Sequence, residues 1–344
     1  YPGPRTMQAT ADWLKDHGQE HESFFLFVDE FDPHEPFDTP EPWASLYDRD
    51  WTGERIIWPP YSTDTLKNGV ITERQAHHIR QNYGAKLSMI DHWLGKVLDA
   101  LDNGGFWDDT MVILCTDHGH YLGEKDIFGK PRVMQYEPIG HTPLLIYHPD
   151  AAPNVISSLS TNVDLHATLT DLFNINVDHV THGRSLLPDI LGLKTPARDW
   201  AVGGIFGNWV QIQDGRYKYA RGPTTDNYPL SMWSNRWSTM PVPYYPGLRL
   251  PNPDARAYID FMPGSSVPVL RQPFEPGDML PFWSMDASLD DHYLFDLQED
   301  PHEEHNLIGS KLEHQMIALL EDALRDLNAP AEQAARLGLP SASY

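Results

Sequence analysis

The sequence has little of three things: cysteine, positive charge and long hydrophobic runs. Cys115 is the only cysteine among 344 residues, which excludes an intrachain disulfide. Lysine and arginine number 25 against 49 aspartates and glutamates, so the formal net charge is −24 and nucleic acid is not expected as a partner. No hydrophobic run approaches the roughly 20 residues of a membrane span, and no signal peptide is visible. The chain opens at Tyr1, so the sequence leaves the cellular compartment open.

What the sequence does contain is typical of a globular protein. Forty per cent of the residues are hydrophobic and 11% are aromatic, and 344 residues suffice for two domains with a sizeable core. Cys115 ends a short hydrophobic run, which predicts a buried structural thiol rather than a nucleophile. The oligomeric state stays open, a homo-oligomer included.

Hydrophobic periodicity predicts an α/β fold. Strands alternate with helices up to about residue 200, which indicates a mostly parallel sheet flanked by helices. The expected strands are 24–28, 111–115 and 144–147, and the expected helices are 5–17, 72–101 and 162–173. In the long helix, the expected hydrophobic stripe is Ile79, Tyr83, Leu87, Ile90, Leu94 and Leu98.

The pattern changes near residue 200. Residues 209–220 alternate around Asp214-Gly215, which predicts a hairpin, and residues 311–327 have helical spacing. We therefore expect an α/β domain over 1–203 and a smaller subdomain of antiparallel sheet plus helix over 204–344.

Residues 223–288 hold twelve of the thirty prolines together with many aromatic residues. This composition argues against long regular elements and against simple disorder. We interpret it as a long ordered insertion that shapes a substrate cleft, and a packed surface excursion is nearly as well supported.

The candidate site follows the strand at 111–115. Asp117 offers a hard carboxylate and His118 an imidazole for a divalent metal, and Gly119 allows the backbone to turn beside them. Lys130 could return a positive charge to the same crevice and hold an anion. Read alone, Asp-His-Gly is equally typical of a polar turn, and a single lysine is usually solvated.

A second candidate is His34, in a Pro-His-Glu-Pro loop just after the strand expected at 24–28. An imidazole there could hydrogen-bond an ester oxygen or protonate a leaving group. Read alone, a loop histidine is more often incidental.

Six segments resemble, in order, motifs of the sulfatase family within the alkaline-phosphatase superfamily. One of them is TDHGxxLGE followed by Gly129-Lys130. The other five are FFLFVDEFDPHEPF at 24–37, QYEPIGHTPLLIYHP at 135–149, NVDLHATLTDLFN at 162–174, HGRSLL at 182–187 and YLFDLQEDPHEEHNL at 293–307.

This resemblance implies an alkaline-phosphatase-like fold and a role for each candidate residue. Asp117 and His118 match metal ligands of the family, where the ion is usually Ca²⁺. Lys130 and His34 match residues that contact the sulfate group and act in catalysis. Because imidazole is a poor calcium ligand, His118 could instead face the ester oxygen as a substrate-binding residue.

The family's Cys-or-Ser-x-Pro-x-Arg motif, whose first residue becomes the formylglycine nucleophile, is absent from this sequence. Lys194 stands where the nucleophile of the one Pro-x-Arg would be, and the strand-end Asp-Asp pair of the family is also missing. We expect that both lie in an N-terminal segment outside residues 1–344, so that this chain alone does not turn over ester.

Three functions remain. The first is a sulfatase that hydrolyses a small-molecule or sugar sulfate ester by a metal-assisted formylglycine mechanism. The second is a phosphodiester or phosphonate monoester hydrolase of the same superfamily. The third is a non-catalytic relict that binds but does not react.

Overall fold

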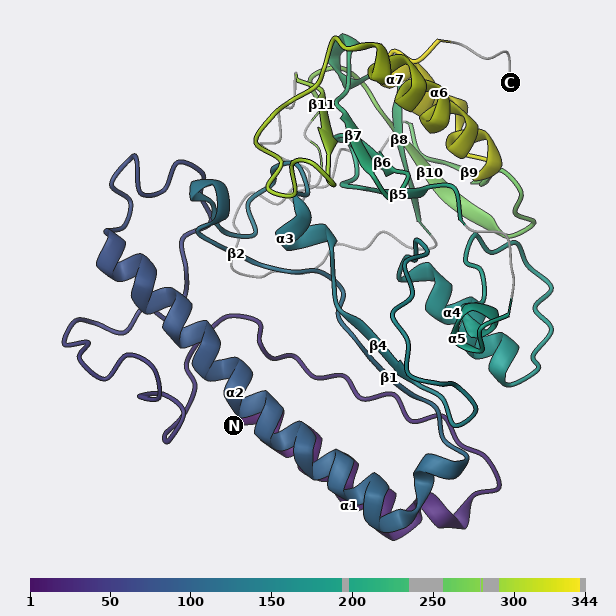
Figure 1. Ribbon diagram of the computed structural model, residues 1–344. Helices are drawn as coiled ribbons and strands as arrows, with labels where there is room; N and C mark the ends of the chain where they lie inside the picture. Colours follow the sequence, from purple (N-terminus) through teal and green to yellow (C-terminus); the bar gives the residue numbers. More distant parts are fainter. Residues whose placement is uncertain (194–197, 235–255, 279, 281–290, 341–344) are drawn as a thin grey trace. The chain divides into compact units, whose positions relative to one another are not determined.

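The computed structural model describes residues 1–193, 198–234, 256–278, 280 and 291–340. The chain forms two compact units (Figure 1). The first comprises Tyr1–Pro131 and Pro138–Ala151, and the second comprises Arg132–Glu137 and Ala152–Tyr344. The domain boundary predicted between residues 203 and 204 falls within strand β5 (Ala201–Gly204), and it stays a prediction.

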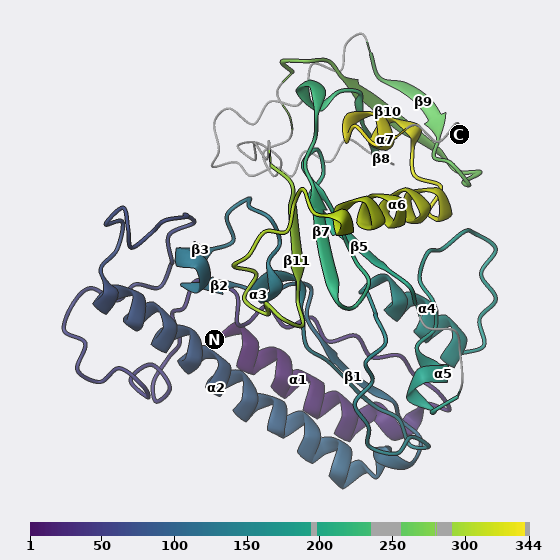
Figure 2. The same cartoon turned by 45° about the horizontal axis from the view of Figure 1, so that its top comes forward.

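Two long helices of the first unit lie side by side and run in the same direction (Figures 1 and 2). They are α1 (Pro2–His17) and α2 (Glu73–Gly104), as the periodicity predicted. Thr72 begins α2 with a capping box, in which its hydroxyl accepts from the Gln75 amide. Gly105 ends the helix in the left-handed region with φ of 67°.

The hydrophobic stripe predicted for α2 is only partly correct. Ile79 is fully buried, but Leu87 and Leu98 are 44% and 38% exposed. The helix instead buries several polar residues beside its small ones, namely His78, Asn82 and Lys86. These polar side chains find partners in the loops that cover α2, so the buried face is not the most hydrophobic one.

The strands of the first unit do not form the expected parallel sheet. Strand β1 (Val112–Cys115) pairs antiparallel with β4 (Leu144–Tyr147), and β2 (Tyr121–Leu122) pairs antiparallel with β3 (Phe128–Gly129). All strand pairs within the described residues are antiparallel. Between β1 and β4 the chain forms the β2–β3 hairpin and the one-turn helix α3 (Glu137–Gly140), and not the crossover helix that usually joins two parallel strands.

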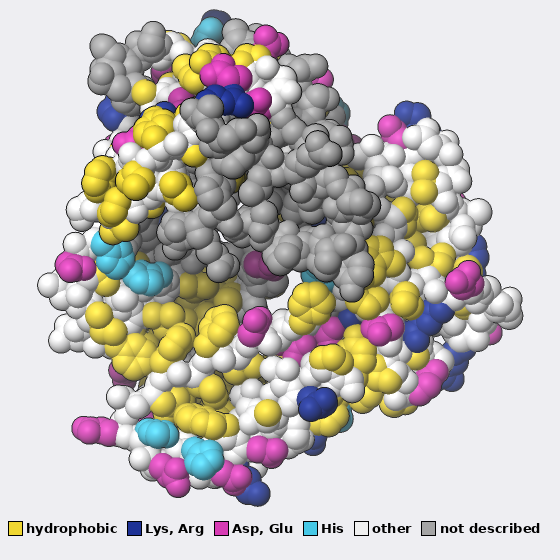
Figure 3. All heavy atoms as spheres, turned by 180° about the vertical axis from the view of Figure 1, so that it is seen from behind, with side chains coloured by type: hydrophobic (Ala, Val, Ile, Leu, Met, Phe, Trp, Pro, Cys, Tyr) yellow, Lys and Arg dark blue, Asp and Glu magenta, His cyan; other side chains and the backbone are white. Residues whose placement is uncertain are grey.

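The segment expected as a strand at 24–28 has no ladder partner among the described residues. Its side chains still alternate as in a strand. Phe24 and Leu26 pack on the cluster of Leu14, Leu101 and Phe106, whereas Phe25 and Phe27 are 60% and 74% exposed. Figure 3 shows exposed hydrophobic side chains of this kind, in yellow, among charged ones.

Cys115 is also exposed at the end of β1, which corrects the prediction of a buried thiol. The prediction assumed helices or strands on both faces of β1, and the two-stranded β1–β4 sheet leaves the end of β1 uncovered.

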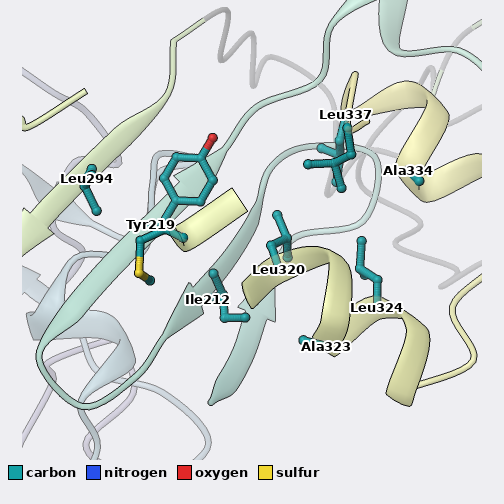
Figure 4. Close-up of a cluster of buried hydrophobic side chains, with 10 residues drawn as sticks. Ile212, Tyr219, Leu294, Leu320, Ala323, Leu324, Ala334 and Leu337 are labelled. Carbon is teal, nitrogen blue, oxygen red and sulfur yellow. The ribbon is translucent and has the colours of Figure 1, made fainter. Parts of the chain in front are cut away.

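The second unit confirms the predicted C-terminal sheet and helix. A four-stranded antiparallel sheet has the order β11–β7–β6–β5, and Asp214-Gly215 forms the turn between β6 and β7 as expected. The sheet packs against α6 through Ile212, Tyr219 and Leu320 (Figure 4). The remaining elements of this unit are α4 (Val163–Leu172), α5 (Leu187–Ile190), β6 (Val210–Gln213), β7 (Tyr217–Arg221), β11 (Tyr293–Asp296), α6 (Lys311–Asp326) and α7 (Ala331–Arg336).

The proline-rich stretch at 223–288, expected as a long ordered insertion without long regular elements, contains a second sheet of short strands. Strands β8 (Leu230–Ser234), β10 (Pro268–Phe274) and β9 (Tyr258–Phe261) pair in that order. Pro268 pairs only with β9 and Pro273 only with β8, so each proline lies where β10 has a single neighbour, and such positions tolerate a residue without a backbone N–H. The rest of the predicted insertion (235–255, 279 and 281–288) lies outside the described residues.

None of the described helices is long and apolar enough to cross a membrane. Short 3-10 turns occupy Gly18–Glu20, Phe106–Asp108, Glu124–Asp126 and Thr225–Asn227.

Candidate functional site

The first unit brings His34 and Lys130 to one buried carboxylate, although 95 residues separate them in the sequence. Glu35 is fully buried, and its Oε1 lies 3.1 Å from Lys130 Nζ. Its Oε2 lies 3.6 Å from His34 Nδ1 and 3.4 Å from His120 Nε2. Three nitrogen-bearing side chains therefore surround one carboxylate.

Helix α2 fixes the loop that carries His34. Lys86 is 1% exposed, and its ammonium donates to the carbonyl oxygens of His34 and Pro36 at 2.7 and 2.6 Å. It also forms an ion pair of 2.8 Å with Asp32. A buried lysine needs such partners, because an unpaired buried charge is strongly unfavourable. The loop 32–36 is therefore held by three bonds to one side chain.

The hydrogen bonds of His34 determine where its proton sits. His34 Nδ1 lies 2.5 Å from the carbonyl oxygen of Glu35. A carbonyl oxygen only accepts, so Nδ1 carries the hydrogen and Nε2 has a lone pair when the ring is neutral. Nε2 can therefore take up a proton and release it again, which is what a general acid or base requires.

Glu35 is held as a carboxylate. Burial by itself raises the pKa of Glu35, but hydrogen bonds from His120 and from its own backbone amide, together with the charge of Lys130, outweigh it. The net result is a pKa of about 2, well below the usual 4.5. Glu35 thus stays ionised and fixes the Lys130 ammonium, whose side chain keeps 17% of its surface exposed.

Asp117 and His118 lie just after β1, as predicted, and are open to solvent. Their side chains are 81% and 45% exposed, and Asp117 Oδ2 lies 3.4 Å from His118 Nε2. His118 Nδ1 bonds the carbonyl of Gly119 at 2.9 Å, so Nε2 is the nitrogen turned toward the carboxylate. Burial raises the pKa of Asp117, and the His118 amide and imidazole more than offset this, so the pKa is lowered overall.

These two residues do not form a complete calcium site. Calcium takes six to eight oxygen ligands, whereas the pair offers one carboxylate and one imidazole. Within the described part of the chain, no three His, Cys, Asp or Glu side chains form a group that could hold a metal ion. The pair can supply at most part of a metal shell.

Gly119 matters for close packing rather than for the sharp turn that the sequence suggested. A Cβ there would lie 1.8 Å from the Pro138 carbonyl oxygen, and the Gly119 amide donates to Ile139 at 3.0 Å. The residue therefore lets the segment after β1 pass against the start of α3.

We expect Gly119→Ala to lower the free energy of unfolding of the first unit by about 2–3 kcal/mol, because the methyl group meets backbone that cannot move aside. Urea titration measures this. Gly95→Ala is the matched control, since a Cβ at this α2 position meets nothing within 4 Å, and it should stabilise by about 0.5–1 kcal/mol. Equal stability of the Gly119 variant and the native chain would contradict the packing role.

Sequence reasoning missed three residues of this site: Glu35, Lys86 and His120. Glu35 lies between His34 and Pro36, and a residue in such a proline-containing segment is typical of an exposed turn. Lys86 was hidden by the helical pattern of α2. His120 alternates with His118 after β1, and this alternation was the one available signal for it.

Comparison with known proteins identifies the family of the chain. A model of the sulfatase family matches residues 4–175. The choline-sulfatase of Rhizobium meliloti is 31% identical over 188 residues, which are 53% of this chain and 36% of that protein. The N-acetylglucosamine-6-O-sulfatase of Bacteroides thetaiotaomicron is 29% identical over 203 residues, covering 58% and 35%. The matches thus span little more than a third of the length of these two relatives.

Solved structures share the fold. The phosphonate monoester hydrolase of Agrobacterium radiobacter superposes with a TM-score of 0.61 at 19% identity, over 94% of this chain and 60% of that one. An alkaline-phosphatase-like fold, expected from the motifs, is confirmed.

Proposed function

Because the chain belongs to the sulfatase family, we propose that it supplies the anion-binding part of a sulfuric ester hydrolase. The observation that carries the proposal is the convergence of Lys130 and His34 on the buried carboxylate of Glu35. The substrate class we propose is a small-molecule or sugar sulfate ester. Residues 1–344 contain no formylglycine motif, so we expect binding without turnover from this chain alone.

Each residue has a distinct role in this proposal. The Lys130 ammonium, fixed by Glu35, attracts a sulfate oxygen and offsets the negative charge of the molecule around it. His34 Nε2 hydrogen-bonds the ester oxygen and, as imidazolium, gives its proton to the leaving group. Both act locally, which explains how a chain of net charge −24 can hold an anion.

We further propose that Asp117 ligates a divalent cation, most simply Ca²⁺, with His118 beside it as a ligand or as a contact to the ester. The described residues do not complete the shell, so no chemical step is assigned to the ion. Calorimetric titration with CaCl₂ tests this part. Asp117→Asn should weaken Ca²⁺ binding about tenfold or more. An unchanged Ca²⁺ affinity would show that Asp117 is not a ligand.

The main test is calorimetric titration with sodium sulfate and with 4-nitrophenyl sulfate. His34→Ala should weaken binding of the ester about tenfold by removing a charge-assisted hydrogen bond, and the exposed His77→Ala on α2 should not change it. No 4-nitrophenol should be released. Release that His34→Ala abolishes would contradict the expectation of binding without turnover.

The alternative function is hydrolysis of phosphonate monoesters or phosphodiesters. Phosphonate monoesters are the substrate class in the name of the Agrobacterium hydrolase that shares the fold. A phenylphosphonate ester in the same titration separates the two. Tighter binding of the phosphonate than of the sulfate ester would favour the alternative.

A further inference from the structure

Two exposed aromatic rings lie against the residues proposed to hold the sulfate. Phe31 is 64% exposed and Tyr61 is 45% exposed. Phe37, six residues after Phe31 in the same loop, is by contrast fully buried.

Phe31 lies next to His34. Their ring centroids are 4.3 Å apart with an angle of 31° between the planes. The His34 amide donates to the Phe31 carbonyl at 3.1 Å, so a turn holds the two residues together. The loop clamped by Lys86 therefore presents an open phenyl ring beside the imidazole.

Tyr61 lies next to Lys130. The Lys130 Nζ is 6.0 Å from the centroid of the Tyr61 ring. Ser62 forms an isolated bridge with Phe128 of β3, and Gly129 at φ of 75° leaves space that a Cβ would take from the Tyr61 ring. The edge of β3 thus fixes Tyr61 beside the lysine.

Each ring therefore neighbours a residue that contacts the Glu35 carboxylate: Phe31 neighbours His34, and Tyr61 neighbours Lys130. An ester whose sulfate sits on Lys130 has its leaving group one bond further on, within reach of these faces. Aromatic faces stack on flat carbon surfaces such as aryl rings or the C–H face of a pyranose. A quaternary ammonium group also favours such faces, but the Lys130 ammonium, 6.0 Å from the Tyr61 ring centroid, is a cation that already faces this ring.

We propose that Phe31 and Tyr61 form the leaving-group subsite and select sulfate esters of an uncharged flat ring over those of a cationic alkyl group. The inference rests on the proposed function, since it takes Lys130 and His34 as the sulfate anchor. It assigns a different preference from the one in the name of the choline-sulfatase that this chain resembles.

The test is calorimetric titration of the full chain, in CaCl₂, with four probes: sodium sulfate, 4-nitrophenyl sulfate, N-acetylglucosamine 6-sulfate and choline sulfate. Phe31→Ala and Tyr61→Ala should each raise the Kd of at least one ring sulfate about tenfold. The Kd of sulfate and of choline sulfate should change less than about twofold. Phe31→Leu keeps a bulky apolar side chain but has no ring, and its Kd values should resemble those of Phe31→Ala. A loss of affinity shared by both variants then comes from the missing ring and not from a folding defect.

Phe27→Ala is the matched control, because Phe27 is a still more exposed phenylalanine of the same segment. A loss of affinity confined to 4-nitrophenyl sulfate identifies an aryl leaving group, and a loss confined to N-acetylglucosamine 6-sulfate identifies a sugar. Ring variants that behave like Phe27→Ala, or that weaken choline sulfate equally, would overturn the subsite while leaving the proposed function intact. If the native chain bound none of the sulfates, the proposed function would fail and the subsite with it.

Discussion

Replacing Lys86 by methionine is expected to destabilise the first unit by about 3–5 kcal/mol, the largest effect of any single substitution we predict. The ammonium is buried and holds the carbonyl oxygens of His34 and Pro36 together with the Asp32 carboxylate. Methionine fills much of the same space, so the loss comes from uncompensated polar groups rather than from a cavity.

The measurement is urea unfolding combined with hydrogen–deuterium exchange of peptides from residues 31–37. Lys96→Met is the control on the same helix, because its 3.8 Å pair with Asp99 is exposed and should contribute less than about 0.5 kcal/mol. Similar stabilities for the two variants would show that Lys86 does not clamp the loop.

The second large effect is expected at Lys130. Lys130→Gln should weaken sulfate binding about a hundredfold, since it removes the positive charge nearest the proposed anion. It should also destabilise the first unit, because Glu35 is then left buried without its cationic partner.

The double variant Lys130→Gln with Glu35→Gln separates these two consequences. Removing both charges should recover most of the stability but none of the sulfate affinity. Lys67→Gln, a change at an exposed surface pair of the same unit, is the control for loss of net charge. Recovered binding in the double variant would contradict a direct role of Lys130.

Glu35 also predicts a pH dependence. Its pKa is lowered from 4.5 to about 2, so it stabilises the fold fully above pH 4.5, and this contribution is lost as the pH falls toward 2. The shift corresponds to about 3 kcal/mol. Acid unfolding of the native chain should therefore show this extra loss between pH 4.5 and 2, and Glu35→Gln should lack it. Parallel acid titrations of the two proteins would refute the pairing.

The sequence by itself determined the local elements and the family. Apolar spacing near 3.6 residues was enough to predict α2, and Asp214-Gly215 was enough to predict the β6–β7 hairpin. These signals are local because a helix or tight turn closes its hydrogen bonds within a few residues. The motifs around Asp117, His118 and Lys130 likewise identified the sulfatase family without a structure.

Only the tertiary structure decided which side chains meet. Whether two strands pair parallel or antiparallel depends on contacts between distant segments, and so does the pairing of residues 24–28, which have no ladder partner among the described residues. Hydrophobic periodicity carries no information about a strand's partner. The same holds for Lys86, an ordinary helix residue until the 32–36 loop folds over it. Glu35 became the centre of the site because burial and three nitrogen-bearing neighbours converge on it from two separate segments, 34–35 and 120–130. Charges that are far apart in the chain interact strongly only once folding brings them within a few ångströms. The sequence therefore did not show that these residues form one site.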